Sequence, residues 1–268
     1  MGVLPRYPPS LKAQNVMGNY KKPTMKHLKT ILVLSLGLNL IASFFVAKRL
    51  YLKYYASNSV TVDKADNKKN LKIKYWLNRQ ELFEVLPKDS NSIIFLGNSL
   101  TQNFELVELF KNINIKNRGI NGDIIVGVLN RLKPIIQTHP KKIFIEIGIN
   151  DLGGGISKDS VIMNYKELLY TLQKECKLTK IYVQSLFPVE NGRDEFPTYC
   201  NPKVNGDIKE INKELQKYAT QHDITFIDTY SKFELGGQLN PKYSVDGIHL
   251  SGEGYLLWTE ILRPYVDE

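Results

Sequence analysis

One serine, one histidine and one aspartate of this 268-residue sequence are spaced so that they could carry out nucleophilic catalysis. The hydroxyl of Ser99 becomes a good nucleophile only when a base removes its proton. His249 is the candidate base, and Asp246 precedes it by three residues, so one turn can bring the carboxylate to the second imidazole nitrogen. Such a contact would fix the tautomer of the ring and stabilise the imidazolium ion. Taken alone, Asp246-Gly247 is better explained as an ordinary turn.

Acyl transfer to Ser99 would also need hydrogen-bond donors for the oxyanion that develops on the substrate. The candidates are the N–H of Ser99, a backbone N–H at Gly119 or Gly122, and the side-chain amide of Asn150. A glycine suits this task because its missing side chain lets the backbone approach the substrate. Each of these residues, taken alone, could equally be an ordinary loop residue.

The elements that must position these residues alternate between strand and helix from residue 71 onward. Apolar runs typical of strands occupy residues 92–96, 113–116, 142–147, 181–186 and 224–227. Helical spacing of apolar residues occurs in 71–86, 124–136, 160–177, 205–221 and 251–262. Ser251 is the expected N-cap of the last helix. The alternation predicts an α/β fold with a parallel sheet that helices cover on both faces.

Sites in such sheets form in the loops just past the carboxyl ends of the strands. The segments 97–100, 117–123, 148–151 and 246–249 occupy this position, and they contain all the candidate residues. Three other histidines do not. His27 precedes an apolar run, whereas His139 and His222 each lead into a strand and so belong to the opposite edge. Topology therefore leaves His249 as the base.

The motifs FLGNSLT, NRGINGD, GIND and DGIH resemble the four sequence blocks of the SGNH hydrolases, also called the GDSL esterase/lipase family. The resemblance spans roughly residues 91–265, and the blocks occur in the family's order. It implies a three-layer, flavodoxin-like fold with five parallel strands. It also implies a nucleophile at Ser99, oxyanion donors at Ser99, Gly122 and Asn150, and Asp246 and His249 as the other triad members.

The family usually has aspartate directly before the nucleophile, where this sequence has Asn98. We expect activity to survive, because an amide can still form a hydrogen bond within the local turn. The sequence has no HExxH motif, paired CxxC motifs or Asp-rich calcium loop, so it implies no metal or other cofactor. Cys176 and Cys200 could form a disulfide outside the cytoplasm, although two cysteines do not require one.

The N-terminal quarter differs from the rest of the chain in charge and hydropathy. Residues 1–67 hold ten basic and two acidic residues, whereas residues 68–268 carry a net charge of only +1. This distribution argues against a nucleic-acid partner for the folded part. Residues 30–47 contain no charged residue, which predicts a membrane-spanning helix; a buried core helix is the alternative.

Six basic residues precede this apolar run and three closely follow it, so residues 1–29 are expected to form a cytoplasmic tail. Bulky aromatic residues at the −3 position of the possible cleavage sites favour an uncleaved signal anchor. Residues 48–70 would then be a stalk, and residues 71–268 an extracytoplasmic catalytic domain, periplasmic or at the cell surface. Met25 opens a segment typical of a bacterial export start, so residues 1–24 could be an upstream extension.

These features predict a serine esterase that hydrolyses short acyl esters, most simply O-acetyl groups on extracytoplasmic carbohydrates. The sequence between the motifs contains no apolar lid for a long acyl chain. A lysophospholipase-like lipid-ester hydrolase is one alternative, because a membrane tether would also hold the enzyme near phospholipids. An O-acyltransferase that acts on cell-envelope glycans is another. A non-catalytic binding module is disfavoured because Ser99, Asp246 and His249 are all intact.

Overall fold

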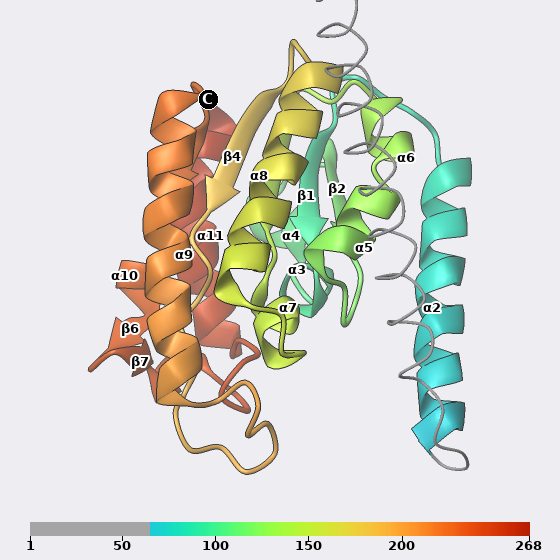
Figure 1. Ribbon diagram of the computed structural model, residues 1–268. Coiled ribbons are helices and arrows are strands. Elements are labelled where there is room, and N and C mark those ends of the chain that lie inside the picture. The colour runs from blue at the N-terminus through green and yellow to red at the C-terminus, as the bar shows by residue number, and fades with distance from the viewer. Residues whose placement is uncertain (1–64) are drawn as a thin grey trace, which may run out of the picture. The chain divides into compact units, whose positions relative to one another are not determined.

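The computed structural model describes residues 65–268, and the segment Asn67–Glu268 forms one compact unit. Within these residues a five-stranded parallel sheet has the order β2-β1-β3-β4-β5. Its strands are β1 (Ile93–Gly97), β2 (Ile115–Gly119), β3 (Lys142–Glu146), β4 (Lys180–Gln184) and β5 (Thr225–Ile227). The predicted α/β fold with five parallel strands is confirmed (Figure 1).

Helices cover both faces of the sheet and form the connections between its strands (Figure 1). One face packs against α5 (Ile125–Asn130), α8 (Lys158–Glu175) and α9 (Pro202–Gln221). The other packs against α3 (Ser99–Gln102), α4 (Leu106–Phe110), α10 (Tyr230–Phe233) and α11 (Gly252–Asp267). The remaining elements are α2 (Ala65–Val85), α6 (Lys133–Ile136), α7 (Ile149–Gly153), a 3₁₀ turn at Pro241–Tyr243, and a hairpin of β6 (Glu234–Leu235) and β7 (Gln238–Leu239).

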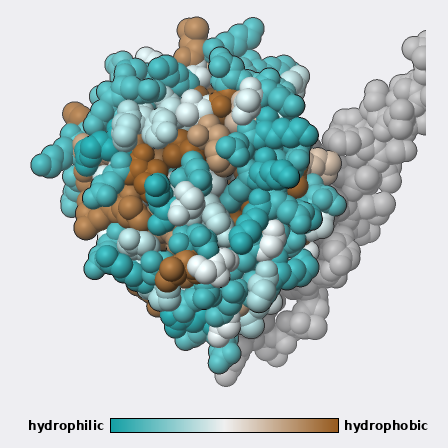
Figure 2. Space-filling view, turned by 90° about the vertical axis from the view of Figure 1, so that its left-hand side faces the viewer, coloured by the Kyte–Doolittle hydropathy of each residue, from teal (hydrophilic) through white to brown (hydrophobic). Residues whose placement is uncertain are grey.

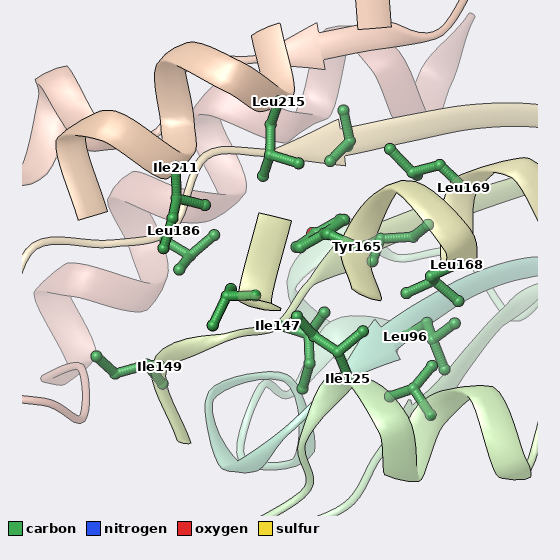
Figure 3. Packing of buried hydrophobic residues seen from close by; sticks show 14 of the residues in the cluster. Leu96, Ile125, Ile147, Ile149, Tyr165, Leu168, Leu169, Leu186, Ile211 and Leu215 are labelled. Atoms are coloured by element: carbon green, nitrogen blue, oxygen red, sulfur yellow. The ribbon is translucent and has the colours of Figure 1, made fainter. Parts of the chain in front are cut away.

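The sequence of each central strand builds two cores because successive side chains point to opposite faces. In β1, Ile94 and Leu96 belong to the aliphatic core beneath α5, α8 and α9, which Figure 3 shows from close by. Ile93 and Phe95 belong to the core on the other face. That second core is aromatic: Phe95 stacks on Phe144 of β3 with ring centroids 4.7 Å apart. Apolar packing on both faces fixes the sheet, and with it the loops at its carboxyl edge.

Three differences from the sequence-based expectations concern elements that border the site. Strand β2 continues through Asn117 and Arg118 to Gly119, whereas the sequence predicted a strand at 113–116 and a loop from residue 117. These polar residues can form a strand because β2 lies at the edge of the sheet. The predicted helix 124–136 is divided into α5 and α6, because the buried Arg131 leaves the helical path and pairs with Asp123.

The third difference concerns helix α2, which begins at Ala65 and so includes residues assigned to the stalk. It lies alongside α5 at the right-hand side of the domain in Figure 1. Ser251 is the N-cap of α11, as predicted, and its hydroxyl accepts a hydrogen bond from the N–H of Gly254.

The predicted cytoplasmic tail, membrane anchor and most of the stalk lie outside the described residues. Among residues 65–268, none of the helices combines the length and the apolar character that a membrane span requires. The face of the domain shown in Figure 2 is mainly hydrophilic, with hydrophobic residues gathered in smaller patches.

Candidate active site

Ser99 lies at the first position of α3, directly after β1, at the carboxyl edge of the sheet. The turn between them needs a glycine at position 97. A Cβ atom there would lie 2.3 Å from Thr101 Oγ1 and 2.4 Å from the backbone oxygen of Glu146. Asn98 is the N-cap of α3, and its Oδ1 accepts a hydrogen bond from the N–H of Leu100 at 2.9 Å. The amide at position 98 therefore forms a hydrogen bond within the local turn, as predicted.

Ser99, His249 and Asp246 form one hydrogen-bonded chain. The Ser99 Oγ atom lies 3.0 Å from His249 Nε2, and His249 Nδ1 lies 2.6 Å from Asp246 Oδ2. His249 and Asp246 follow the last strand and precede α11, and the contact with Ser99 brings the imidazole to the carboxyl end of β1. Such a chain can pass the serine proton to the imidazole while the carboxylate stabilises the resulting positive charge.

Asp246 is held in the ionised form that this chain needs. Burial acts to raise the pKa of Asp246, but hydrogen bonds from the His249 ring and from the N–H groups of His249 and Ile248 outweigh it and leave the pKa below its usual value. The two backbone bonds measure 2.8 and 3.0 Å and both end on Oδ1. Oδ2 is thereby left for the imidazole.

The candidate oxyanion donors all follow strands at the carboxyl edge of the sheet, as Ser99 does. The Ser99 N–H is at the start of α3, where a helix offers no internal acceptor. Gly122 has a φ of +76° and is exposed, and within residues 65–268 its N–H has no acceptor. The N–H of Gly119, by contrast, is bonded to Asn117 Oδ1 at 2.9 Å. The geometry therefore favours Gly122 over Gly119 as the donor.

Asn150, the third candidate donor, lies in the short helix α7 after β3. Its Nδ2 atom donates one hydrogen bond to the backbone oxygen of Asp123 at 2.9 Å. A side-chain amide nitrogen carries two N–H groups, so the second remains for a ligand. The loop that contains Gly122 and the side chain of Asn150 are thus directly connected.

Two buried carboxylates at this edge did not emerge from the sequence as site residues. Asp123 forms a buried ion pair with Arg131, with Oδ2 2.7 Å from Nε. Asp151 accepts the N–H of Ile125 at the start of α5, and burial raises the pKa of Asp151 to about 7. Both belong to the motifs quoted above, but only the fold shows that their side chains point inward and hold neighbouring loops together.

The segment between β4 and α9 borders the same site. Phe196 packs edge-on against the imidazole of His249, with ring centroids 6.4 Å apart. Gly247 adopts a φ of +91° and has Arg193 Cγ and Cys200 Sγ close to the position of a Cβ atom. Cys200 and Cys176 are both buried free thiols.

The other described histidines lie where topology placed them, before β3 and before β5. His139 precedes β3, and His222 is the C-cap of α9 with Nδ1 2.8 Å from the backbone oxygen of Tyr218. His27 lies outside the described residues. Within residues 65–268, no group of three or more His, Cys, Asp or Glu side chains is arranged to hold a metal ion.

Comparison with known proteins agrees with this geometry. The model of the GDSL-like lipase/acylhydrolase family matches residues 95–257. The human platelet-activating factor acetylhydrolase IB subunit alpha2 is 30% identical over 196 residues, which cover 67% of this chain and 78% of that protein. A solved structure from Streptococcus pneumonia, named for a platelet activating factor, shares 26% identity at a TM-score of 0.66, covering 76% of this chain and 98% of that one.

An N-acylneuraminate cytidylyltransferase from Streptococcus agalactiae is 27% identical over 177 residues, or 66% of this chain. The match covers only 39% of the length of that relative. The family match extends over more than half of the sequence and includes Ser99, Gly122, Asn150, Asp246 and His249. The chain belongs to the GDSL-like lipase/acylhydrolase family.

Proposed function

We propose that this protein is a membrane-anchored serine esterase that removes short acyl groups, chiefly O-acetyl groups, from extracytoplasmic carbohydrates. The observation that carries the catalytic part is the continuous chain from Ser99 Oγ through His249 to Asp246, with steps of 3.0 and 2.6 Å. Ser99 is the nucleophile of this mechanism, and His249 is its general base and then its general acid.

In the first half of the reaction, Ser99 Oγ attacks the ester carbonyl carbon while its proton moves to His249 Nε2. The N–H groups of Ser99 and Gly122 and the side-chain amide of Asn150 stabilise the negative oxygen of the tetrahedral intermediate. When the intermediate collapses, the bond to the alcohol oxygen breaks, and His249 transfers its proton to that oxygen. The sugar hydroxyl leaves, and the acyl group stays on Ser99.

In the second half, a water molecule gives a proton to His249 and attacks the acyl-serine carbonyl carbon. Collapse of the second intermediate returns the proton from His249 to Ser99 Oγ and releases the carboxylic acid. Asp246 remains ionised throughout, and its contact with Nδ1 holds the ring in the required tautomer.

A short acyl group is supported by the surroundings of His249 and by one relative. Phe196 packs directly against the imidazole, so an aromatic ring occupies space beside the reacting atoms. The human relative is by name an acetylhydrolase. A carbohydrate substrate is supported by the streptococcal relative, which is named for an N-acylneuraminate, an acylated sugar acid.

The location rests on the sequence pattern of residues 1–70. The uncharged run 30–47 and the excess of basic residues before it support an anchor with the catalytic domain outside the cytoplasm. A C-terminal fusion of the full chain to a reporter enzyme that is active only outside the cytoplasm tests this part. An inactive reporter in a stably expressed fusion would contradict the proposed orientation.

The catalytic part is tested by the rates of the full chain on nitrophenyl esters of increasing acyl length, with Ser99→Ala as the inactive control. A steep fall in kcat/KM beyond acetate or propionate is expected. A maximum at long chains would favour a lipid-ester hydrolase. Unchanged activity in Ser99→Ala would overturn the mechanism.

An acetylated phospholipid is a second candidate substrate, because the human relative is named for platelet-activating factor. Acetate release should be measured from an O-acetylated oligosaccharide and from an acetylated phospholipid at matched ester concentration. Faster release from the oligosaccharide is expected. Faster release from the phospholipid would replace the carbohydrate by a lipid as the substrate, with the same catalytic residues.

A further inference from the structure

We propose that helix α2 is part of the catalytic apparatus, with Trp76 as a positioning residue that holds the oxyanion donor Gly122 through Asp123. This inference rests on the role of Gly122 in the proposed function. It extends that role to a helix that lies before the first sequence block of the family match.

Gly122 needs support from its neighbours because little else holds it. It is exposed, it has a positive φ of +76°, and nothing lies within 4 Å of the position of a Cβ atom. An oxyanion donor must nevertheless keep a fixed position relative to the nucleophile, since a displacement of about 1 Å can cost on the order of 100-fold in rate. The residues on either side of Gly122 therefore decide where its N–H points.

Helix α2 is linked to both of these neighbours, to Asp123 directly and to Asn121 through Gln102. On one side, Trp76 Nε1 donates a hydrogen bond to Asp123 Oδ1 at 2.9 Å. On the other, the N–H of Asn121 and the hydroxyl of Tyr75 both donate to Gln102 Oε1, each at 2.8 Å. Two consecutive residues of one helix thus hold the loop immediately before and immediately after Gly122.

Asp123 transmits this support to the rest of the site. Its Oδ2 accepts from Arg131 Nε at 2.7 Å, and Arg131 Nη2 donates to the backbone oxygen of Gly97 at 3.1 Å, two residues before Ser99. The backbone oxygen of Asp123 accepts a hydrogen bond from Asn150 Nδ2 at 2.9 Å. Asp123, a single buried residue, therefore connects the loop around Gly122, the turn before Ser99 and the candidate oxyanion donor Asn150.

The sequence makes room for this contact at Gly127, within α5. A Cβ atom at position 127 would lie 2.0 Å from Asp123 Oδ1 and 3.5 Å from Trp76 Nε1. Glycine in a helix costs roughly 0.5–1 kcal/mol relative to alanine, so α5 loses some stability by having it. The close approach of Asp123 and Trp76 explains the glycine.

A second set of contacts, around Phe83, keeps α2 docked when the Trp76 hydrogen bond is removed. Phe83, which is buried, has three guanidinium groups around its ring, with the carbon atoms of Arg79, Arg118 and Arg131 at 4.7, 4.9 and 5.8 Å from the centroid. Trp76→Phe should therefore remove one hydrogen bond without releasing the helix.

The test compares Trp76→Phe with Leu77→Ala in the full chain. Leu77 is the next residue of the same helix and is 52% exposed. With nitrophenyl acetate we expect kcat of Trp76→Phe to fall on the order of 10-fold at nearly unchanged KM, because the oxyanion exists only after attack. Gly127→Ala should lower kcat in the same way, and Leu77→Ala should leave it unchanged. An unchanged kcat in Trp76→Phe, or an equal loss in Leu77→Ala, would overturn the proposal.

A second measurement does not depend on activity. Hydrogen exchange of the segment 119–125 should be faster in Trp76→Phe than in wild type and unchanged in Leu77→Ala. Equal exchange in all three proteins would overturn the proposal even if no ester were cleaved. If wild type is inactive, or Ser99→Ala is active, the proposed function fails, whereas the exchange result still decides the role of Trp76.

Discussion

Asp246 binds His249 twice, through two different oxygen atoms. Oδ1 accepts the backbone N–H of His249 at 2.8 Å, and Oδ2 lies 2.6 Å from the ring nitrogen Nδ1. The first contact shapes the turn, and the second fixes the tautomer that leaves Nε2 free to accept the proton of Ser99. Oδ1 of Asp246 therefore stabilises the turn, whereas Oδ2 takes part in catalysis.

This division predicts the behaviour of Asp246→Asn. An asparagine oxygen can still accept the backbone N–H, but its NH₂ group cannot accept a hydrogen bond from the Nδ1–H group of His249. We expect the fold and the melting temperature to stay close to wild type while kcat falls by about 10⁴-fold. Asp246→Ala is the comparison, because it removes both contacts and should also lower the melting temperature. A kcat within tenfold of wild type in Asp246→Asn would exclude the proposed role of Asp246.

Asn150→Ala should lower kcat by about 10²–10³-fold, because it removes one oxyanion donor. KM should change much less, since the donor acts on a charge that is absent from the ground state. Steady-state kinetics with an aryl acetate measures both constants. Asn114→Ala is a suitable control, since Asn114 is exposed and precedes β2, at the edge of the sheet opposite the site. A loss confined to KM would remove Asn150 from the oxyanion hole.

The burial of Glu146 should make the stability of the protein depend on pH. Its side chain is buried, neither carboxyl oxygen has a hydrogen-bond partner among residues 65–268, and burial raises the pKa of Glu146 from 4.5 to about 8. Between these values the folded protein keeps a proton that the unfolded chain releases. The free energy of unfolding therefore falls as pH rises through this window, by up to about 1.4 kcal/mol for each pH unit.

Glu146→Gln removes this titration with little change in volume. Thermal melts followed by circular dichroism between pH 5 and pH 9 should show a smaller decline in melting temperature for the variant than for wild type. Some decline should remain, because burial also raises the pKa of Asp151 to about 7. Parallel curves for the two proteins would show that Glu146 does not titrate in this range.

We expect a substitution at Asn98 to lower the melting temperature without lowering kcat. The residue is fully buried, its oxygen caps α3, and its nitrogen has no hydrogen-bond partner within the described part of the chain. An aspartate would keep the capping oxygen but bury a charge, which costs stability. Asn98→Asp should therefore retain kcat and melt at a lower temperature. Asn98→Ala should lose the cap, worth about 1 kcal/mol. Inactivity of a folded Asn98→Asp variant would contradict this expectation.

The main features of the fold could be predicted because each strand and long helix has a clear apolar pattern. The apolar run before Gly97 is continuous, as expected for a strand buried on both faces, and the structure has strands both there and before Gly148. Topology then placed Ser99 and His249 on the same edge, and their side chains lie 3.0 Å apart. The order of the strands did not have to be known for that step.

The features that the sequence could not show depend on contacts between segments that are distant along the chain. Strand β2 extends to Gly119 because it pairs with β1, although residues 117 and 118 are polar. The path of the chain at Arg131 depends on Asp123, and the role of Trp76 depends on where α2 docks. A tryptophan in a helical segment gives no sign of which carboxylate it will meet.

The separation of the site residues along the chain has a consequence for how the enzyme acquires activity. Asp246 and His249 are three residues apart, whereas 150 residues separate Ser99 from His249. The acid–base pair can therefore form within its own turn, but the nucleophile meets it only when the C-terminal segment docks on β1. Closing so long a loop is among the slower steps expected in folding. Recovery of esterase activity during refolding should thus follow the last long-range assembly step, later than the recovery of helix content.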